Sequence, residues 1–191
     1  MGLDIHIGTD NYNEVYSAEY YTDETNYRSK MRLSRTFCNF MCRRDMVSGI
    51  ADLDQLGKLA NIDIAPIYEM NKYWSDEAIA EQLPLYETEN ERKNAIEKIT
   101  IINKKIEGNI DKVIRTVNRL IENLSVIPGL EKKIDTHGYD TLGSEIYYTH
   151  FNTEDDQPNG VDNFGRDLRN FKRFLEYAKN KGAKTVYFNY G

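Results

Sequence analysis

The feature that most constrains the fold is a run of apolar residues in steps of three and four along the second half of the chain. The run consists of Ile99, Ile102, Ile106, Ile110, Val113, Val117, Leu120, Leu124 and Ile127. Thr88 and Glu91 have the spacing of a capping box ahead of it, and Pro128 follows it. The pattern predicts one amphipathic helix over about 88–125, with a heptad seam over 99–127.

Gly108 lies within this run and offers an alternative, a break into a helical hairpin. The apolar phase continues from Ile106 to Ile110, whereas a loop normally resets the phase, so we favour a continuous helix. Such a helix overhangs a domain of 191 residues. We therefore expect a homo-oligomer through the 99–127 seam, and the alternative is that other helices of the same chain cover the stripe.

Shorter patterns describe the rest of the chain. Leu3, Ile5 and Ile7 alternate with polar residues, which predicts a strand. Similar signals predict strands at 15–21, 145–151 and 185–190. Helical spacing predicts short helices at 33–44, at 52–59 with a capping pair of Asp52 and Gln55, after Pro66 and from Ser75 to Pro84, and a final helix from Phe164 to Gly182. We expect a single α+β domain over 1–191, with a small, mainly antiparallel sheet, several short helices and the long helix projecting or forming an interface.

Composition narrows the classes of function. The net charge of −6 makes nucleic acid an unlikely partner, because binding phosphates requires clustered Lys and Arg. No apolar run approaches the ~20 residues of a membrane span, and the N-terminus lacks the order of a signal peptide, so we expect a cytoplasmic protein without a membrane segment. Cys38 and Cys42 are expected to be core thiols, since two thiols alone make no zinc site.

The histidines suggest one possible chemistry. His6 and His150 lie on predicted strands, and their imidazoles could converge with Asp4 if those strands are neighbours. Such a group would suit the acid–base or metal chemistry of a small phosphoesterase. Histidines in a sheet are more often hydrogen-bonded or exposed, and the chain has no P-loop or other common enzyme signature, so this remains the alternative.

The arginines suggest anion binding. Arg166, Arg169 and Arg173 share one face of the final helix and could hold a phosphate or carboxylate. The other interpretation is a solvated face with ion pairs to Asp167 and Glu176. A second basic cluster contains Arg32, Arg35, Arg43 and Arg44, and the 14 tyrosines slightly favour a binding surface. The candidate ligand-binding set is Arg35, Tyr148, Arg166, Arg169 and Arg173, with no metal or cofactor.

Three stretches carry a resemblance. They are Met1-Gly2-Leu3-Asp4-Ile5-His6-Ile7, the segment from Leu33 to Arg43 with Asp54-Gln55-Leu56-Gly57 after it, and the closing segments 163–171 and 187–191. Together they resemble small uncharacterised proteins of bacteriophages and prophages that begin Met-Gly-Leu-Asp. The resemblance implies a mobile-element origin and supplies no catalytic residues. Small accessory phage proteins commonly block host factors or sequester host signals.

These observations lead to one expected function. We expect a phage- or prophage-encoded, non-enzymatic binding protein in the host cytoplasm. It would act against host defences by sequestering an anionic small molecule, such as a signalling nucleotide, or by blocking a host protein. The phosphoesterase with Asp4, His6 and His150 is the alternative.

Overall fold

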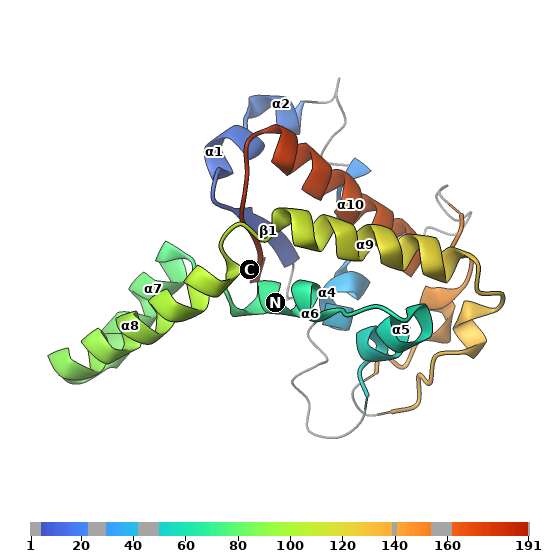
Figure 1. Cartoon of the computed structure of the whole chain (residues 1–191), viewed down its shortest axis with the longest axis horizontal. Coiled ribbons are helices and arrows are strands. Elements are labelled where there is room, and N and C mark those ends of the chain that lie inside the picture. Colours follow the sequence, from blue (N-terminus) through green and yellow to red (C-terminus); the bar gives the residue numbers. More distant parts are fainter. Residues whose placement is uncertain (1–4, 23–29, 42–49, 139–140, 154–161, 191) are drawn as a thin grey trace.

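The computed structural model describes residues 5–22, 30–41, 50–138, 141–153 and 162–190 (Figure 1). Helices and a small sheet form a body, and two helices project from it as an arm. The elements in chain order are β1 (Ile5–Thr9), α1 (Tyr12–Val15), α2 (Ala18–Tyr21), α4 (Arg35–Met41), α5 (Asp52–Ala60), α6 (Ala65–Glu69), η2 (Met70–Lys72), α7 (Asp76–Gln82), η3 (Leu83–Leu85), α8 (Glu89–Ile106), α9 (Ile110–Ser125), η4 (Leu130–Lys132), η5 (Glu145–Tyr148), α10 (Phe164–Asn180) and β2 (Val186–Tyr190).

The predicted mixture of helices with a small antiparallel sheet is confirmed. In the described part of the chain the sheet has two strands, β1 and β2, which come from the two chain ends and pair antiparallel. Ile5 lies opposite Tyr190, and Thr9 lies opposite Val186. The cross-strand neighbour of Tyr187 is Gly8, where a Cβ atom would lie only 2.1 Å from the Tyr187 ring. Any side chain at that position would therefore require the Tyr187 ring to move.

Two predicted strands are wrong. Residues 15–21 belong mainly to α1 and α2. Tyr16 directly follows α1 and Tyr20 lies in α2, and their rings lie 5.0 Å apart. Residues 145–148 form the 3-10 helix η5, and the adjacent residues Tyr147 and Tyr148 are both buried. Neighbouring buried side chains are incompatible with the alternation of a half-buried strand.

The predicted continuous helix is also wrong, because it breaks at Gly108 into α8 and α9. Gly108 has a φ of 72°, in the left-handed region that glycine adopts readily, and Glu107 has an extended ψ of 134°. The junction is fastened to the segment that leads into β2. The Gly108 N–H donates to Thr185 Oγ1 at 3.0 Å, and the Ile110 N–H donates to the Lys184 carbonyl at 3.1 Å. These tertiary bonds stabilise a break that the apolar phase alone does not reveal.

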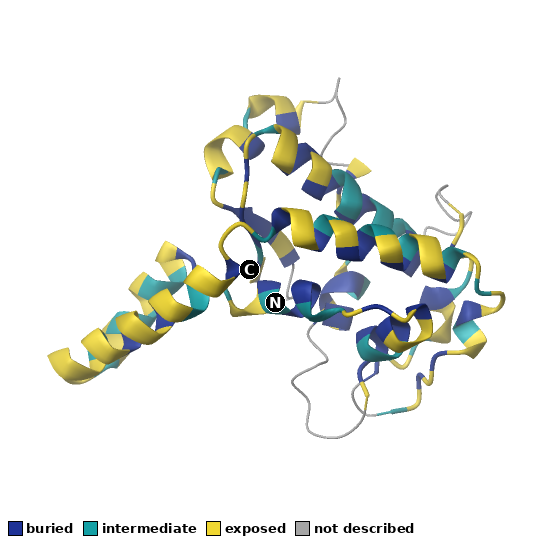
Figure 2. Ribbon diagram, in the orientation of Figure 1, coloured by how far each residue is buried: buried dark blue, intermediate teal, exposed yellow. Residues whose placement is uncertain are grey.

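The half of the predicted seam that lies in α9 is buried within the chain itself. Val113, Val117 and Leu120 are fully buried, and α9 packs against α10 and α5 (Figure 2). The predicted apolar stripe of the final helix is confirmed, since Phe171 and Leu175 are also fully buried. The 110–124 part of the seam is therefore not free to bind a second copy, and the reason for predicting an oligomer through it disappears.

The arm consists of α7 and α8, and its surface is mostly exposed (Figures 1 and 2). The predicted capping box is confirmed, since the Glu91 N–H donates to Thr88 Oγ1 and the Thr88 N–H donates to Glu91 Oε2. Ser75 caps α7, as predicted, by accepting from the Ala78 N–H. At the base of the arm the Asn103 side chain bonds both backbone groups of Trp74. Its Oδ1 accepts from the Trp74 N–H and its Nδ2 donates to the Trp74 carbonyl.

Other local predictions have mixed outcomes. Pro66 lies in the first turn of α6, as expected. The proposed capping pair of α5 is wrong, because Asp52 Oδ2 accepts from the Leu142 N–H and Gln55 donates to the Asp135 carbonyl. Cys38 is buried, as expected for a core thiol, whereas Cys42 lies outside the described residues. Within the described ranges, no helix combines the length and apolar character needed to cross a bilayer.

Candidate ligand-binding site

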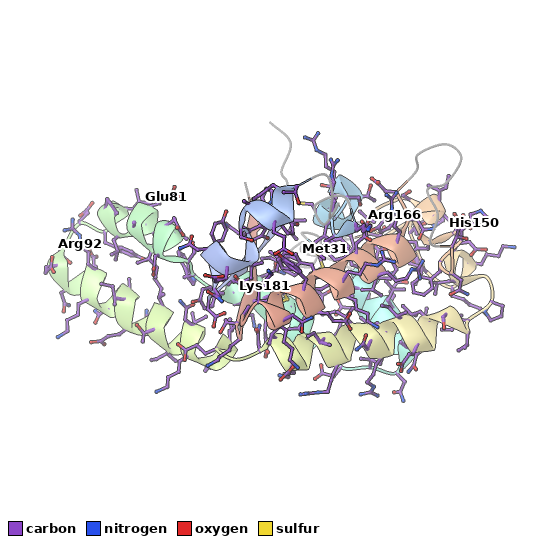
Figure 3. All side chains as sticks on the ribbon, turned by 90° about the horizontal axis from the view of Figure 1, so that it is seen from above. Met31, Glu81, Arg92, His150, Arg166 and Lys181 are labelled. Atoms are coloured by element: carbon purple, nitrogen blue, oxygen red, sulfur yellow. The ribbon has the colours of Figure 1, made fainter. Side chains whose placement is uncertain are left out.

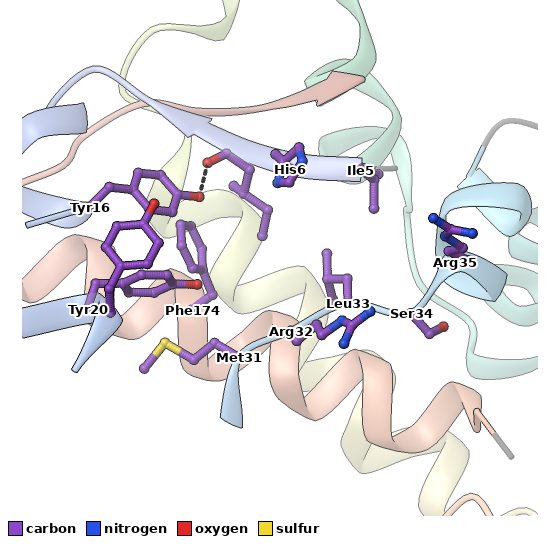
Figure 4. Close-up of a pocket in the computed structure, with 12 residues that line it drawn as sticks. Ile5, His6, Tyr16, Tyr20, Met31, Arg32, Leu33, Ser34, Arg35 and Phe174 are labelled. Atoms are coloured by element: carbon purple, nitrogen blue, oxygen red, sulfur yellow. Dashed lines mark hydrogen bonds between the residues drawn. The ribbon is translucent and has the colours of Figure 1, made fainter. Parts of the chain in front are cut away.

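One cavity of about 310 Å³ brings together part of the sheet, the tyrosines of the N-terminal helices and the segment that leads into α4 (Figure 4). Tyr16, Tyr20 and Phe174 lie together on one side, Arg35 lies on the other, and Arg32 lies between. The cavity therefore has an aromatic side and a basic side. Its other lining residues include His6, Ser34, Met31 and Tyr21.

The aromatic side is held together by ring packing. Tyr16 lies four residues before Tyr20, and its ring packs 5.7 Å from that of Phe174 on α10. The Tyr16 hydroxyl donates to the Ile7 carbonyl of β1 at 2.7 Å. Burial raises the pKa of the Tyr16 hydroxyl well above its ordinary value, and neighbouring tyrosines raise it further, chiefly Tyr20. Tyr16 therefore stays neutral and keeps donating its proton to β1.

The basic side is positioned by α10. The Ser34 N–H and hydroxyl donate to the two carboxylate oxygens of Asp167 at 2.9 and 2.5 Å. One turn further along, the Asn170 side chain donates to the Arg32 carbonyl at 2.8 Å. The Ser34 hydroxyl also accepts from the Phe37 N–H, which fixes the start of α4. The backbone that carries both arginines is thus fastened to a buried helix, while the two side chains are exposed.

Asp167 is the polar centre of this arrangement. It is only 3% exposed and also accepts a hydrogen bond from the Tyr147 hydroxyl at 2.7 Å. Burial raises the pKa of the Asp167 carboxyl from 3.8 to about 6, although the bonds from Ser34 and Tyr147 act in the opposite direction. One interpretation of the sequence makes Asp167 an ion-pair partner on a solvated arginine face. That interpretation is wrong for Asp167, because its side chain is buried. Its spacing, three residues after Phe164 and four before Phe171, could have indicated the buried face.

None of the described residues that line this cavity is an arginine of α10. Arg169 donates from Nη2 to the carbonyls of Phe151 and Thr153, at 2.7 and 2.8 Å, and its guanidinium lies over the Phe151 ring. Arg173 donates to Asn170 Oδ1 at 2.8 Å. Arg166 occupies the first turn of α10, where its N–H donates to the capping Asn163. These contacts give Arg169 a structural task, which is to tie the 151–153 segment to α10.

Tyr148 and His150 line a second cavity, of about 340 Å³, beside the C-terminal end of α9. Tyr148 is fully buried, and burial raises the pKa of its hydroxyl far above the ordinary value, with the nearby Asp52 carboxylate adding to the shift. His150 has a φ of 53°. It lies at the end of the molecule away from the arm, whereas Met31, which lines the first cavity, lies near the middle (Figure 3).

The two histidines do not meet. His6 lines the first cavity and His150 the second, and the described linings of the two cavities have no residue in common. The condition for their convergence, a strand at 145–151, is not fulfilled. Asp4, the third member of the proposed group, lies outside the described residues. Among the residues that are described, no cluster of His, Cys, Asp or Glu has the arrangement of a metal site.

The structure therefore places in one cavity residues that the sequence analysis had treated separately. His6, Arg32 and Arg35 had been identified as candidates or cluster members, but Tyr16, Tyr20 and Phe174 had not been connected with them. The high strand propensity of the tyrosines favoured a strand, and the contacts of their rings with each other and with Phe174 depend on the tertiary structure. Comparisons with protein-family models, with curated proteins and with solved structures found no match.

Proposed function

We propose that this protein binds an anionic, aromatic small molecule of the mononucleotide class in the cavity between β1, α2 and α10, and does not transform it. The observation that carries the proposal is the division of one cavity into an aromatic side, with Tyr16, Tyr20 and Phe174, and a basic side with Arg32 and Arg35. A nucleotide has the same division, with a base at one end and a phosphate at the other.

The chemistry of each side fits its half of such a ligand. Bases stack on aromatic rings, and this stacking tolerates different bases. Tyr21 also lines the cavity and, at 53%, is the most exposed of its aromatic residues. A guanidinium can donate two parallel hydrogen bonds to a phosphate. Because the chain has a net charge of −6, anion binding has to rely on such short-range contacts.

Cavity size limits the ligand. A volume of about 310 Å³ lies at the low end of the roughly 300–1,000 Å³ that small-molecule sites occupy. We therefore assign one mononucleotide and not a dinucleotide. The proposal gives His6 a binding role, since none of the described lining residues is a carboxylate that could act with it. The phosphoesterase alternative loses its basis once His6 and His150 line separate cavities.

The biological role that goes with this binding comes from the resemblance to phage and prophage proteins. In that role the protein would sequester a signalling nucleotide of the host. Sequestration requires affinity and abundance but no catalysis, so a cavity without an acid–base pair is sufficient for it. Blocking of a host protein remains the other expectation from the resemblance.

Isothermal titration calorimetry with a panel of ribonucleoside monophosphates, ribose 5-phosphate and inorganic phosphate tests the proposal. We expect one or more nucleotides to bind, with affinity reduced roughly tenfold by Arg32→Ala and by Tyr21→Ala, since each removes one charge-assisted or stacking contact. Arg119→Ala, on the exposed face of α9, is the matched control and should bind normally.

Two outcomes would overturn the proposal. One is the absence of binding by every member of the panel. The other is binding that neither Arg32→Ala nor Tyr21→Ala weakens, because the ligand would then lie elsewhere. Mass spectrometry of the recovered nucleotide separates binding from catalysis: conversion that is lost in His6→Ala would favour the phosphoesterase instead.

A further inference from the structure

The backbone groups of β1 alternate between the two sides of the strand. The Asp10 N–H donates to the Thr185 carbonyl at 3.3 Å, one step beyond the last paired residues of β1 and β2. Antiparallel strands exchange hydrogen bonds at every second residue, so His6 also faces β2. The N–H and C=O groups of Ile5 and Ile7 therefore point away from β2, to the outer edge of β1.

The outer edge of β2 shows the same alternation. Val186 is adjacent to Thr185, and so its backbone groups point away from β1. The Asn109 side chain binds both of them, since Nδ2 donates to the Val186 carbonyl and Oδ1 accepts from the Val186 N–H, both at 2.8 Å. The outer edge of β2 is therefore closed at this residue by a polar side chain.

The first cavity lies along the outer edge of β1. Side chains alternate along a strand, so Ile5 and Ile7 belong to one face of the sheet and His6 to the other. All three residues line the cavity. A cavity that contacts both faces of an edge strand passes along its edge. Tyr16, which also lines the cavity, reaches this edge with its hydroxyl, which donates to the Ile7 carbonyl (Figure 4).

Three backbone groups at this edge are open. The N–H and C=O of Ile5 and the N–H of Ile7 have no hydrogen-bond partner among the residues that the structure describes. Ile5 and Ile7 are only 8% and 4% exposed, and buried backbone groups normally have partners. Along the edge the Ile5 carbonyl is followed by the Ile7 N–H, so an open acceptor and an open donor are neighbours.

The position of these groups decides which part of a nucleotide meets them. Ile5 lies on the Arg35 side of the cavity, whereas Tyr16 bonds the Ile7 carbonyl from the aromatic side (Figure 4). The neighbouring acceptor and donor therefore lie between the side assigned to the phosphate and the side assigned to the base. Phosphate oxygens accept hydrogen bonds, so an ionised phosphate has no proton to donate to the Ile5 carbonyl. A ribose hydroxyl can both donate and accept.

We infer that the outer edge of β1 holds the ribose of the nucleotide through its 2′ and 3′ hydroxyls. One hydroxyl donates to the Ile5 carbonyl, and the other accepts from the Ile7 N–H. The base then lies on the aromatic side of the cavity and the phosphate on the basic side. The protein is therefore specific for ribonucleotides. This inference rests on the proposed function.

Dideoxynucleotides test the inference on the unmodified protein. Adenosine 5′-monophosphate and uridine 5′-monophosphate are each compared by calorimetry with their 2′,3′-dideoxy forms, which keep the base and the phosphate. We expect the dideoxy form of whichever nucleotide binds to be roughly tenfold weaker or more, because two buried backbone groups lose their partners.

A backbone variant locates the contact on β1. Ile7→Pro removes an N–H that points away from β2, so no sheet hydrogen bond is lost, and it keeps the carbonyl that Tyr16 bonds. Ile7→Ala is the matched control, because it also truncates the side chain but keeps the N–H. We expect the preference for the ribonucleotide over its dideoxy form to be roughly two- to tenfold smaller in Ile7→Pro than in Ile7→Ala. A general weakening of the site cancels in this ratio, because both ligands have the same base and phosphate.

The outcomes separate the inference from the proposed function. If the ribonucleotide and its dideoxy form bind the unmodified protein equally, the ribose contact is refuted and nucleotide binding stands. An equal preference in Ile7→Pro and Ile7→Ala would also refute the contact. If no nucleotide binds, the proposed function itself is refuted. If Ile7→Pro fails to fold, the comparison on the unmodified protein decides the question alone.

Discussion

Replacing Asp167 with asparagine removes a buried charge and keeps the shape of the side chain. The carboxylate is 3% exposed and receives hydrogen bonds from Ser34 and Tyr147. Burial raises the pKa of its carboxyl from 3.8 to about 6. The folded protein therefore binds this proton more tightly than the unfolded chain does, and the protein becomes less stable when the proton leaves.

The sign and size of the effect follow from this difference. The stabilisation from the protonated group is fully present below the unfolded pKa of 3.8 and is lost as the pH rises through about 6. At about 1.4 kcal/mol per pKa unit, the full difference is on the order of 3 kcal/mol. Between pH 5 and pH 7 the group contributes a loss on the order of 1 kcal/mol in the free energy of unfolding.

Urea unfolding at pH 5 and pH 7 measures this contribution. The loss of stability on going from pH 5 to pH 7 should be about 1 kcal/mol greater in the unmodified protein than in Asp167→Asn. Asp111→Asn is the matched control: this aspartate is exposed and the Lys179 side chain lowers its pKa, so it stays charged across the interval and no such difference is expected.

The reasoning would be refuted by an equal pH dependence of the unmodified protein and Asp167→Asn. It would also be refuted by a difference of the opposite sign. That result would mean that the hydrogen bonds from Ser34 and Tyr147 outweigh burial and hold the pKa of the carboxyl low.

Three further predictions concern the body of the protein, each measured by urea unfolding. Asn109→Ala should cost about 1–3 kcal/mol, because both backbone groups of Val186 lose their partner, and an unchanged midpoint would contradict the role of this residue at the sheet edge. Gly165→Ala should cost about 3 kcal/mol or more, since its Cβ would lie 1.9 Å from the Phe151 carbonyl oxygen, and wild-type stability would show that this close approach is absent. Leu120→Ala should cost about 2–5 kcal/mol in the monomer, and a cost that depends on protein concentration would instead place this side chain in an interface between copies.

Features that depend on a few neighbouring residues could be predicted from the sequence. Thr88 with Glu91, and Ser75 ahead of α7, form caps in which donor and acceptor lie within one turn, so their spacing is sufficient to identify them. The apolar stripe of α10 and the strands at the two chain ends were predicted for the same reason, since their periods of 3.6 and two residues are local properties. The α+β class follows from these elements.

The tertiary structure decided the features that depend on distant residues. The break at Gly108 is held by residues 184–186, and the preserved phase across it gave no sign of those contacts. The predicted strand at 145–151 failed because Tyr147 bonds Asp167 and Tyr148 lies beside Asp52, both far away in the chain. The periodicity of a sequence indicates which face of a helix or strand is apolar. It does not indicate which distant residue forms a hydrogen bond with a given polar group.

The candidate site shows the same division. The sequence identified Arg35 as a residue able to bind an anion and His6 as a candidate for acid–base or metal chemistry, and these local inferences needed no fold. That both line one cavity with Tyr16, Tyr20 and Phe174, while His150 and the arginines of α10 lie elsewhere, depends on how the two tyrosines and the segment before α4 pack against α10. The long apolar run likewise determined that helices form here; only the packing of α9 on α5 and α10 decided that this chain covers much of its own seam.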